Sequence, residues 1–292
     1  MYLPRFQYLA PAGEAELASM LAEHGDKARI LAGGTDLLVQ MKAPGLWPDY
    51  LIDIRNVAEL SSIEFDDQDG LTVGASAKLE NILNTPAVAE RYHGLYQAIE
   101  TIGARQILTM GSMGGNICNA SPAADSPPAL MSFNAQVTIG STQGDKEMAL
   151  EDFIRGNRKT ALGVGEYLKS IFLPAPAAKS GSAYHYFRVR GGMEIAMVAA
   201  AVYVEADLAD KSLKDIKIVL GVVGPTPIRA LEAEDMLTGQ TPDEDLLAKA
   251  LGSCAAVSKP IDDFRASAEY RREILKVLVQ RAFGEAYTIA TS

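Results

Sequence analysis

Leu31-Ala32-Gly33-Gly34-Thr35-Asp36-Leu37 joins a short apolar stretch to a predicted helix at residues 35–42. Glycine lacks a Cβ atom, so the backbone at Gly33 and Gly34 can adopt positive φ and approach a ligand closely. Amides at the start of a helix have no partners within it and can face a phosphate. Because a carboxylate would repel a phosphate, we expect Asp36 to cap the helix or turn away. A simple strand–turn–helix corner is the alternative interpretation.

A second glycine-rich passage spans residues 109–125, with Ser-Met-Gly-Gly-Asn at 112–116. Its hydroxyl and amide side chains suit phosphate and sugar oxygens, and Asp125 can accept hydrogen bonds from a ribose or polyol. We interpret residues 111–128 as one long loop, and loops of this length are usually functional. A purely structural loop is the alternative. Neither passage has the G-x-G-x-x-G or G-x-x-x-x-G-K-[ST] pattern, so a Rossmann or P-loop site has no support.

Helical and extended patterns alternate around these passages. A Pro-, Ala-, Gly- and Ser-rich stretch at 174–182 predicts a domain boundary. We therefore expect a first domain at 1–176, with subdomains of about 1–56 and 57–176, and a second domain at 177–292. The predicted helices of the first domain are 13–24, 35–42, 77–84 and 88–102, and its predicted strands are 29–32, 50–54, 71–75, 137–140, 148–150 and 167–173. The second domain is predicted to have strands at 183–189, 198–205 and 216–223 and helices at 228–238, 243–257 and 267–282.

Composition excludes several classes of protein. The formal net charge of −10 over 292 residues argues against binding to nucleic acid or to an anionic membrane surface. No apolar run approaches the roughly 20 residues of a membrane span, and residues 1–12 lack the pattern of a secretory signal. Two cysteines are too few for a disulfide framework or an iron–sulfur cluster. We expect a cytoplasmic protein.

The sequence contains no cluster of carboxylates or histidines suited to acid–base chemistry. Of the 3 histidines, His24 and His93 lie on predicted helices away from both passages. We therefore expect no catalytic residue and no metal site in this chain.

The ordered series of motifs resembles one known family. Ala32-Gly33-Gly34-Thr35-Asp36-Leu37 is followed by Gly111-Ser112-Met113-Gly114-Gly115-Asn116-Ile117, by Ser121-Pro122-Ala123-Ala124-Asp125 and by Ala268-Glu269-Tyr270-Arg271-Arg272. Together they are similar to the FAD-binding medium subunits of the xanthine dehydrogenase and carbon monoxide dehydrogenase family, over nearly the whole chain. The resemblance implies an α+β fold with FAD between two N-terminal subdomains, comparable to the fold of vanillyl-alcohol oxidases. A C-terminal domain of antiparallel sheet and helices would cover the flavin edge.

The resemblance also assigns FAD contacts. Asp125 would bind the polar chain of FAD, and Ile102 and Leu168 would lie beside the isoalloxazine. The two passages would surround the diphosphate through Ala32, Gly33, Gly34, Thr35, Asp36, Leu37, Ser112, Met113, Gly114, Gly115, Asn116 and Ile117.

A further segment, 184–196, matches the part of the family that approaches the flavin. Family members often have Lys or Arg where this chain has Tyr186, and Asp where it has Glu194. Tyr186 can donate a hydrogen bond but carries no charge, so the substitution bears on flavin potential and acceptor preference. Arg188 or Arg190 can compensate in part. Plain sheet packing is the alternative role for the Tyr184–Tyr186 cluster.

The resemblance implies an electron-transfer subunit. A large subunit with the molybdenum cofactor would oxidise the substrate, and a small iron–sulfur subunit would deliver electrons to FAD. The flavin would pass them to NAD, a quinone or another carrier. One alternative is a self-sufficient flavin oxidase, but many of these attach FAD through His or Cys, and only Cys118 lies near either passage. A non-redox nucleotide-binding scaffold or maturation protein is the other alternative.

Overall fold

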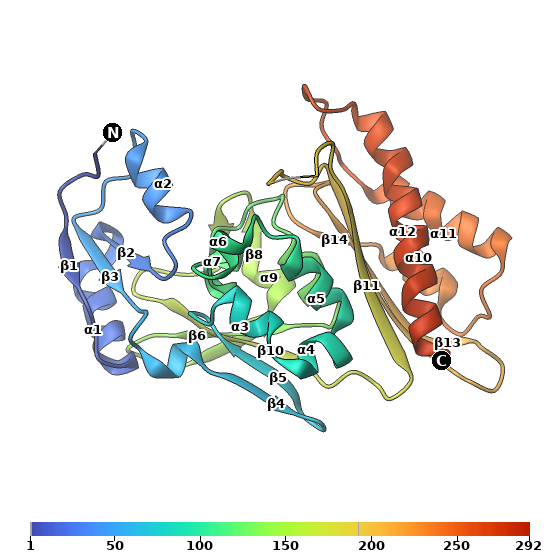
Figure 1. Cartoon of the computed structure of the whole chain (residues 1–292), viewed down its shortest axis with the longest axis horizontal. Coiled ribbons are helices and arrows are strands. Elements are labelled where there is room, and N and C mark those ends of the chain that lie inside the picture. Colours follow the sequence, from blue (N-terminus) through green and yellow to red (C-terminus); the bar gives the residue numbers. More distant parts are fainter. Residues whose placement is uncertain (1, 192) are drawn as a thin grey trace.

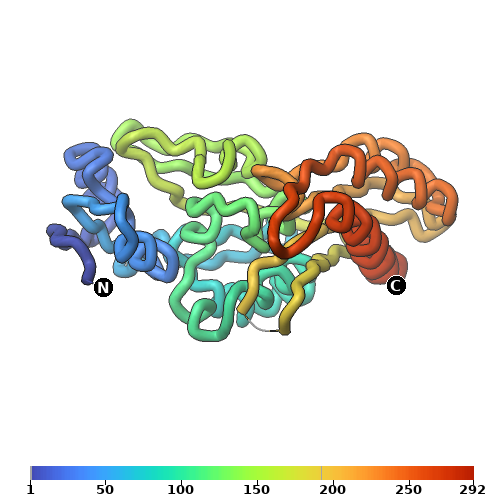
Figure 2. Tube along the Cα trace, turned by 90° about the horizontal axis from the view of Figure 1, so that it is seen from above, coloured from blue at the N-terminus to red at the C-terminus, as the bar shows by residue number. Residues whose placement is uncertain are grey.

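The computed structural model describes residues 2–191 and 193–292. Its three larger sheets and their helices follow one another in a row, from the N-terminal sheet at one end to the C-terminal sheet at the other (Figures 1 and 2). The mixture of helices and sheets agrees with the expected α+β class. No helix in these two ranges combines the length and apolar character needed to cross a bilayer.

The first sheet is parallel and carries the first glycine passage at the end of a strand. Helix α1 (Glu14–His24) buries Leu17 and Leu21, which lie on one face because they are four residues apart. Helix α2 (Leu37–Lys42) follows the passage directly. The strands, in sheet order β1-β3-β2, are β1 (Gln7–Leu9), β3 (Tyr50–Asp53) and β2 (Ala28–Leu31).

The central sheet is antiparallel and carries most of the helices around the second passage. Its strands, in order, are β4 (Ile63–Asp66), β5 (Gly70–Gly74), β10 (Tyr167–Pro174), β6 (Gln136–Gly140) and β7 (Lys146–Ala149). The accompanying helices are α3 (Leu79–Leu83), α4 (Pro86–Arg91), α5 (His93–Glu100), α6 (Arg105–Leu108), α7 (Met113–Cys118), α8 (Ser126–Ser132) and α9 (Leu150–Phe153). A small hairpin of β8 (Ile154–Gly156) and β9 (Lys159–Thr160) completes this part.

The third sheet is covered on both faces. Strand β12 (Val198–Ala206) lies between β11 (Ser180–Phe187) and β13 (Leu213–Gly221), and β14 (Ile228–Arg229) pairs with β13. Alternate residues of β12 join two different cores: Ala199 and Ala201 face the central part, whereas Ala200 and Val202 face the C-terminal helices. This explains the continuous apolar run at 198–204, since a strand buried on both faces has no polar side. The covering helices are α10 (Leu231–Leu237), α11 (Glu244–Val257) and α12 (Ala268–Ala290).

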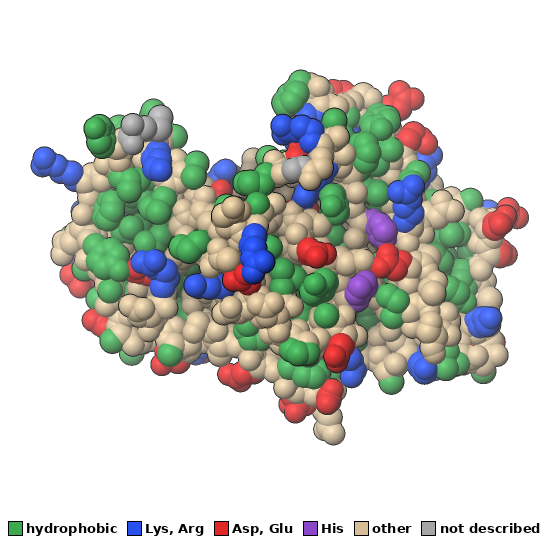
Figure 3. All heavy atoms as spheres, viewed as in Figure 1, with side chains coloured by type: hydrophobic (Ala, Val, Ile, Leu, Met, Phe, Trp, Pro, Cys, Tyr) green, Lys and Arg blue, Asp and Glu red, His purple; other side chains and the backbone are tan. Residues whose placement is uncertain are grey.

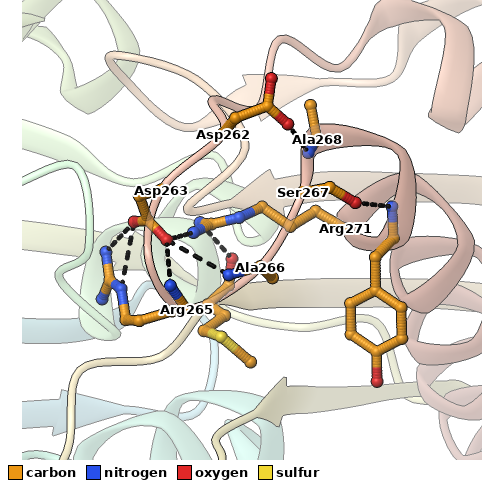
Figure 4. A network of polar contacts seen from close by, with 9 residues as sticks. Asp262, Asp263, Arg265, Ala266, Ser267, Ala268 and Arg271 are labelled. Carbon is orange, nitrogen blue, oxygen red and sulfur yellow. Dashed lines mark hydrogen bonds and ion pairs between the residues drawn. The ribbon is translucent and has the colours of Figure 1, made fainter.

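A buried arginine fastens the start of α12 to the sheet (Figure 4). Arg271 is 2% exposed and donates to the carbonyl oxygen of Met197 at 3.2 Å and to Asp263 Oδ1 at 2.7 Å. Asp263 also accepts from Arg265. The loop before α12 is therefore held against the beginning of β12 through the two terminal nitrogens of Arg271, whereas its buried Nε has no partner among the described residues.

Several predicted elements need correction. The helix expected at 88–102 is two helices, α4 and α5, because Tyr92 leaves helical geometry (φ −123°, ψ 49°) and buries its ring against Phe65 and Phe133. The long loop expected at 111–128 contains α7 and the start of α8. The helix expected at 228–238 begins as strand β14, and the last helix extends to Ala290.

Candidate functional site

The two glycine passages meet at their backbones. A Cβ atom on Gly33 would lie 1.9 Å from the carbonyl oxygen of Met110 and 2.8 Å from the Cα of Gly111. Only glycine allows this approach, since Cβ contacts under about 3 Å do not occur in relaxed structures. The β2–α2 corner and the α6–α7 turn therefore form one continuous backbone surface.

The first passage offers a run of backbone donors. Among the described residues, none accepts a hydrogen bond from the amides of Gly33, Gly34, Thr35 and Asp36. Gly34 has φ 73°, the left-handed conformation that turns successive amides toward one side. Such concave arrays of N–H groups bind anions, above all phosphates.

The carboxylate of Asp36 does not accept a hydrogen bond from these amides. Asp36 is the N-cap of α2 without a side-chain hydrogen bond to the helix. Its Oδ2 accepts instead from Asn119 Nδ2 at 3.2 Å. Asn119 follows α7, and its Oδ1 accepts from Gln40 of α2 at 3.2 Å. Asp36 thus turns aside, as expected, and helps to join the two passages.

In the second passage the two adjacent glycines serve different purposes. Gly114 packs against Ala75, whose oxygen lies 2.5 Å from the position of an added Cβ, and its amide donates to that oxygen at 2.9 Å. At Gly115 an added Cβ would meet only Ser112 Oγ, at 3.0 Å. Ser112 Oγ accepts from the Gly115 amide at 3.1 Å and so caps α7. Gly115 is the glycine whose open side can meet a ligand.

Most of the other predicted residues of the passages pack in a core or connect helices. Met113 and Ile117 are fully buried in the central core. Asn116 accepts from Ser126 Oγ at 2.6 Å, which ties α7 to α8. Leu37 packs into a small cluster around Met41.

Ser76 was not among the residues predicted from the sequence. Its hydroxyl is buried, and among the described residues none hydrogen-bonds to it. The neighbouring carbonyls of Ala75 and Ala77 accept from Gly114 and Met113, so Ser76 lies directly behind the second passage. A buried hydroxyl without a partner is costly, and a ligand oxygen would satisfy it. The sequence signal that could have indicated Ser76 was the run of small residues at 75–77, immediately after β5.

A groove of ≈ 630 Å³ lies between the end of α5 and strand β11. Its lining includes Thr101, Gly103 and Ala104 on one side and Tyr184, Tyr186 and Arg188 on the other. Ile102 lies between the lining residues Thr101 and Gly103 and is 8% exposed, whereas Leu168 lies in the central core on β10. Tyr186 is 40% exposed, so its ring presents an accessible aromatic face.

Asp125 connects the second passage to the C-terminal sheet. Its Oδ1 accepts from the Tyr184 hydroxyl at 2.7 Å and its Oδ2 from Arg188 at 3.2 Å. Burial raises the pKa of Asp125 above its ordinary value, against the opposing effects of the Tyr184 hydrogen bond and the Arg188 charge. Burial also raises the pKa of Tyr184, so this hydroxyl stays protonated and donates.

The two glycine passages and the groove suit one elongated ligand. Helix α6 begins at the groove after Ala104 and leads to Met110, which contacts Gly33. The molecular surface is hollowed between the N-terminal part and the upper end of the C-terminal sheet, over the region where Figure 1 places α6 and α7 (Figure 3). Free amides and the unpartnered Ser76 hydroxyl suit a diphosphate, and the groove with its aromatic wall suits a flat ring system. The residues present therefore fit a flavin dinucleotide.

The cysteine near the second passage is not poised for covalent attachment of a flavin. Burial raises the pKa of Cys118 to about 12. Because the thiolate is the reactive form, this side chain is a poor nucleophile at neutral pH.

Two family descriptions match the chain. Residues 4–176 match the FAD binding domain in molybdopterin dehydrogenase, and residues 182–286 match the CO dehydrogenase flavoprotein C-terminal domain. Among curated proteins, the chain is 33% identical to the glyceraldehyde dehydrogenase medium chain of Sulfolobus acidocaldarius, over 98% of this chain and 99% of the relative. It is 30% identical to the carbon monoxide dehydrogenase medium chain of Afipia carboxidovorans, over 95% of each chain.

Solved structures of related enzymes are also similar to this chain over nearly its whole length. A chain of carbon monoxide dehydrogenase from Hydrogenophaga pseudoflava has a TM-score of 0.94 at 29% identity, covering 99% of both chains. A chain of quinoline 2-oxidoreductase from Pseudomonas putida 86 has a TM-score of 0.92 at 29% identity, covering 100% of both chains.

Proposed function

The chain belongs to the family of FAD-binding subunits of molybdenum hydroxylases, such as carbon monoxide and xanthine dehydrogenases, and on this premise we propose how it holds FAD and serves electron transfer. When bound, FAD accepts electrons singly or in pairs and so links one-electron and two-electron partners. The tasks of this chain are to bind the cofactor, orient it and exclude water from it.

We place the FAD diphosphate at the contact of the two glycine passages. The observation that carries this assignment is the run of free amides at residues 33–36, beside the open face of Gly115. The Ser76 hydroxyl supports it, because a phosphate oxygen would supply its missing partner. Met113 and Ile117, predicted as contacts, would act from the core by positioning α7.

We place the isoalloxazine in the groove between the α5–α6 turn and β11. Tyr186 offers an aromatic face there, and Thr101 to Ala104 form the opposite wall. The predicted contacts of Ile102, Leu168 and Asp125 with FAD stay predictions. Asp125 has the strongest support, since it lies between the second passage and the groove through its bonds to Tyr184 and Arg188.

The proposed partners are a large subunit with the molybdenum cofactor, a small iron–sulfur subunit and an external electron acceptor. The support is that the relatives are called medium chains or FAD-binding subunits. NAD, a quinone and other carriers are all compatible as acceptors. We further propose that the complex is cytoplasmic. We also propose a domain boundary between residues 176 and 177, which the two separate family matches support.

Isolation of the tagged full-length chain from its native cells tests this function. We expect it to bring down a large and a small chain, with molybdenum and iron measurable in the complex and FAD releasable from it. The bound FAD should be reduced when a substrate of the complex is added without oxygen. Isolation as a flavin-only monomer that oxidises an organic substrate by itself would overturn the proposal.

A further inference from the structure

Arg188 has an unusual position for a charged side chain. It follows β11 at the groove, and only 11% of its side chain is exposed. One guanidinium nitrogen donates to the carbonyl oxygen of Thr101 at 2.9 Å and to Asp125 Oδ2 at 3.2 Å. The guanidinium carbon lies 4.4 Å from the centre of the Tyr186 ring. The side chain is thus held on three sides within the groove.

Its hydrogen bonds are incomplete. The Nε atom of Arg188 is buried, and among the described residues none accepts from it. An arginine presents five N–H donors and cannot lose its proton. A buried donor of this kind without an acceptor is expensive. Because Arg188 lines the groove, an electron-rich ligand group there would supply the missing acceptor.

The second arginine of this segment, Arg190, differs from Arg188 in its exposure to solvent. The Arg190 side chain is 73% exposed, and its Nε lies 3.3 Å from Glu194 Oε1. Because this side chain is well exposed, water screens its charge. Of these two arginines, only Arg188 brings a positive charge into a poorly solvated place.

Given FAD in the groove, as in the proposed function, we propose that Arg188 is the residue whose positive charge favours the reduced cofactor in this chain. Reduction adds negative charge to the flavin ring, and charge close to that ring is one means by which proteins adjust flavin electronics. In a partly desolvated groove this interaction is stronger than in water. Tyr186 contributes by stacking beneath the guanidinium, which restricts its orientation.

Asp125 balances part of this charge but does not cancel it. The Tyr184 hydroxyl donates to the same carboxylate at 2.7 Å and shares its electron density. Burial favours the neutral form of Asp125 by raising its pKa. Glu100 also lines the groove, and the contribution of the Arg188 charge to the field there grows if Asp125 is made neutral.

The test is the flavin reduction potential of the full-length chain loaded with FAD, measured spectroscopically against reference dyes. Arg188→Gln keeps a donor within the groove but removes the charge, and Arg188→Lys keeps the charge. Arg190→Gln is the matched control, because it removes the same charge two residues away. The Asp125→Asn variant, measured at pH 9, keeps the shape of the side chain and removes the opposing charge.

We expect Arg188→Gln to lower the preference for reduced over oxidised flavin at least tenfold, which is about 30 mV for a two-electron couple. Arg188→Lys and Arg190→Gln should stay close to the unaltered chain, and Asp125→Asn should raise the potential. Equal potentials for Arg188→Gln and Arg190→Gln would overturn the proposal. If Arg188→Gln does not fold, an unchanged potential in Asp125→Asn overturns it instead. Failure of the unaltered chain to bind FAD would refute the proposed function, which is a separate outcome.

Discussion

At Gly33 the backbone of the first passage touches that of the second, and an added Cβ would lie 1.9 Å from the oxygen of Met110. The three atoms nearest to this Cβ are main-chain atoms of Met110 and Gly111, so they cannot give way as a flexible side chain would. We expect Gly33→Ala to destabilise the chain by roughly 1–3 kcal/mol, the usual range for overpacking. It should also weaken FAD binding at least tenfold, because the free amides at 33–36 would be displaced. Thermal unfolding and flavin fluorescence titration measure the two effects.

Gly252 supplies the control for this change. It lies on α11, where an added Cβ would meet nothing within 4 Å. Gly252→Ala should leave FAD affinity unchanged and stabilise the chain by up to about 1 kcal/mol through helix propensity. Equal FAD affinities in Gly33→Ala and Gly252→Ala would show that the contact of the two passages does not shape the binding site.

Ser76 allows ligand binding to be separated from folding. Removing a buried hydroxyl that has no protein partner leaves no donor or acceptor unsatisfied, so Ser76→Ala should leave the stability of the FAD-free chain unchanged or slightly raise it. If the hydroxyl meets the FAD diphosphate, the same change should lower FAD affinity by roughly tenfold, about 1.4 kcal/mol. Calorimetric titration of both forms with FAD decides this. A loss of stability without loss of affinity would contradict the assigned role.

At the scale of single elements, the N-terminal sheet depends on a buried carboxylate. Asp53 ends β3, accepts from the Tyr8 hydroxyl of β1 at 2.6 Å and from Arg55 Nε at 2.9 Å. Burial opposes its ionisation, but the hydrogen bonds from Arg55 and Tyr8 outweigh burial and lower the pKa of Asp53 from 3.8 to about 2. The ionised side chain therefore links two strands of a sheet that has only three.

Because folding lowers this pKa, the stabilisation is present above the unfolded-state value and is lost as the pH falls from about 4 toward 2. A shift of this size corresponds to roughly 2 kcal/mol. We expect Asp53→Asn to reduce stability at pH 7 and to flatten the decline of stability between these pH values. Denaturant unfolding at several pH values measures both. Asp235→Asn on the exposed face of α10 is the control, and an acid profile of Asp53→Asn identical to the control would refute the argument.

Some helices and strands could be predicted from the sequence alone, and others could not. The strand–Gly-Gly–helix corner was predictable, because glycine between an apolar run and a helical pattern has a local physical reason. The break at Tyr92 was not, since it depends on aromatic contacts with Phe65 and Phe133, far away in the sequence. Strand β14 was read as helix because its 2 residues owe their conformation to pairing with β13.

In the candidate site, too, some residues could be predicted from the sequence and others could not. The glycine passages were visible as patterns, whereas Ser76 is a lone serine whose importance lies only in its missing partner. The bond between Asp125 and Arg188 spans 63 positions in the chain. Periodicity and composition carry no information on such a pair, so the structure was needed to distinguish Arg188 from Arg190.

At the scale of the whole molecule, the C-terminal sheet contributes to two hydrophobic cores and so connects the C-terminal helices to the central part. One face of β12 packs against α12, and the other packs against α5 and α8 of the central part. Polar contacts reinforce this junction: Glu285 of α12 accepts from Gln97 of α5 at 2.8 Å and contacts His185 of β11 at 2.7 Å. The groove therefore has walls from both sides of a well-packed interface, which suits a cofactor whose orientation must be fixed.

FAD binding by this chain is the property on which its role in electron transfer depends. The most direct measurement is the visible absorption spectrum of the purified full-length chain, followed by the mass of any compound released on denaturation. We predict flavin absorption bands and the release of intact FAD, and rebinding of FAD by the emptied chain. A colourless chain that also fails to bind added FAD would contradict the account.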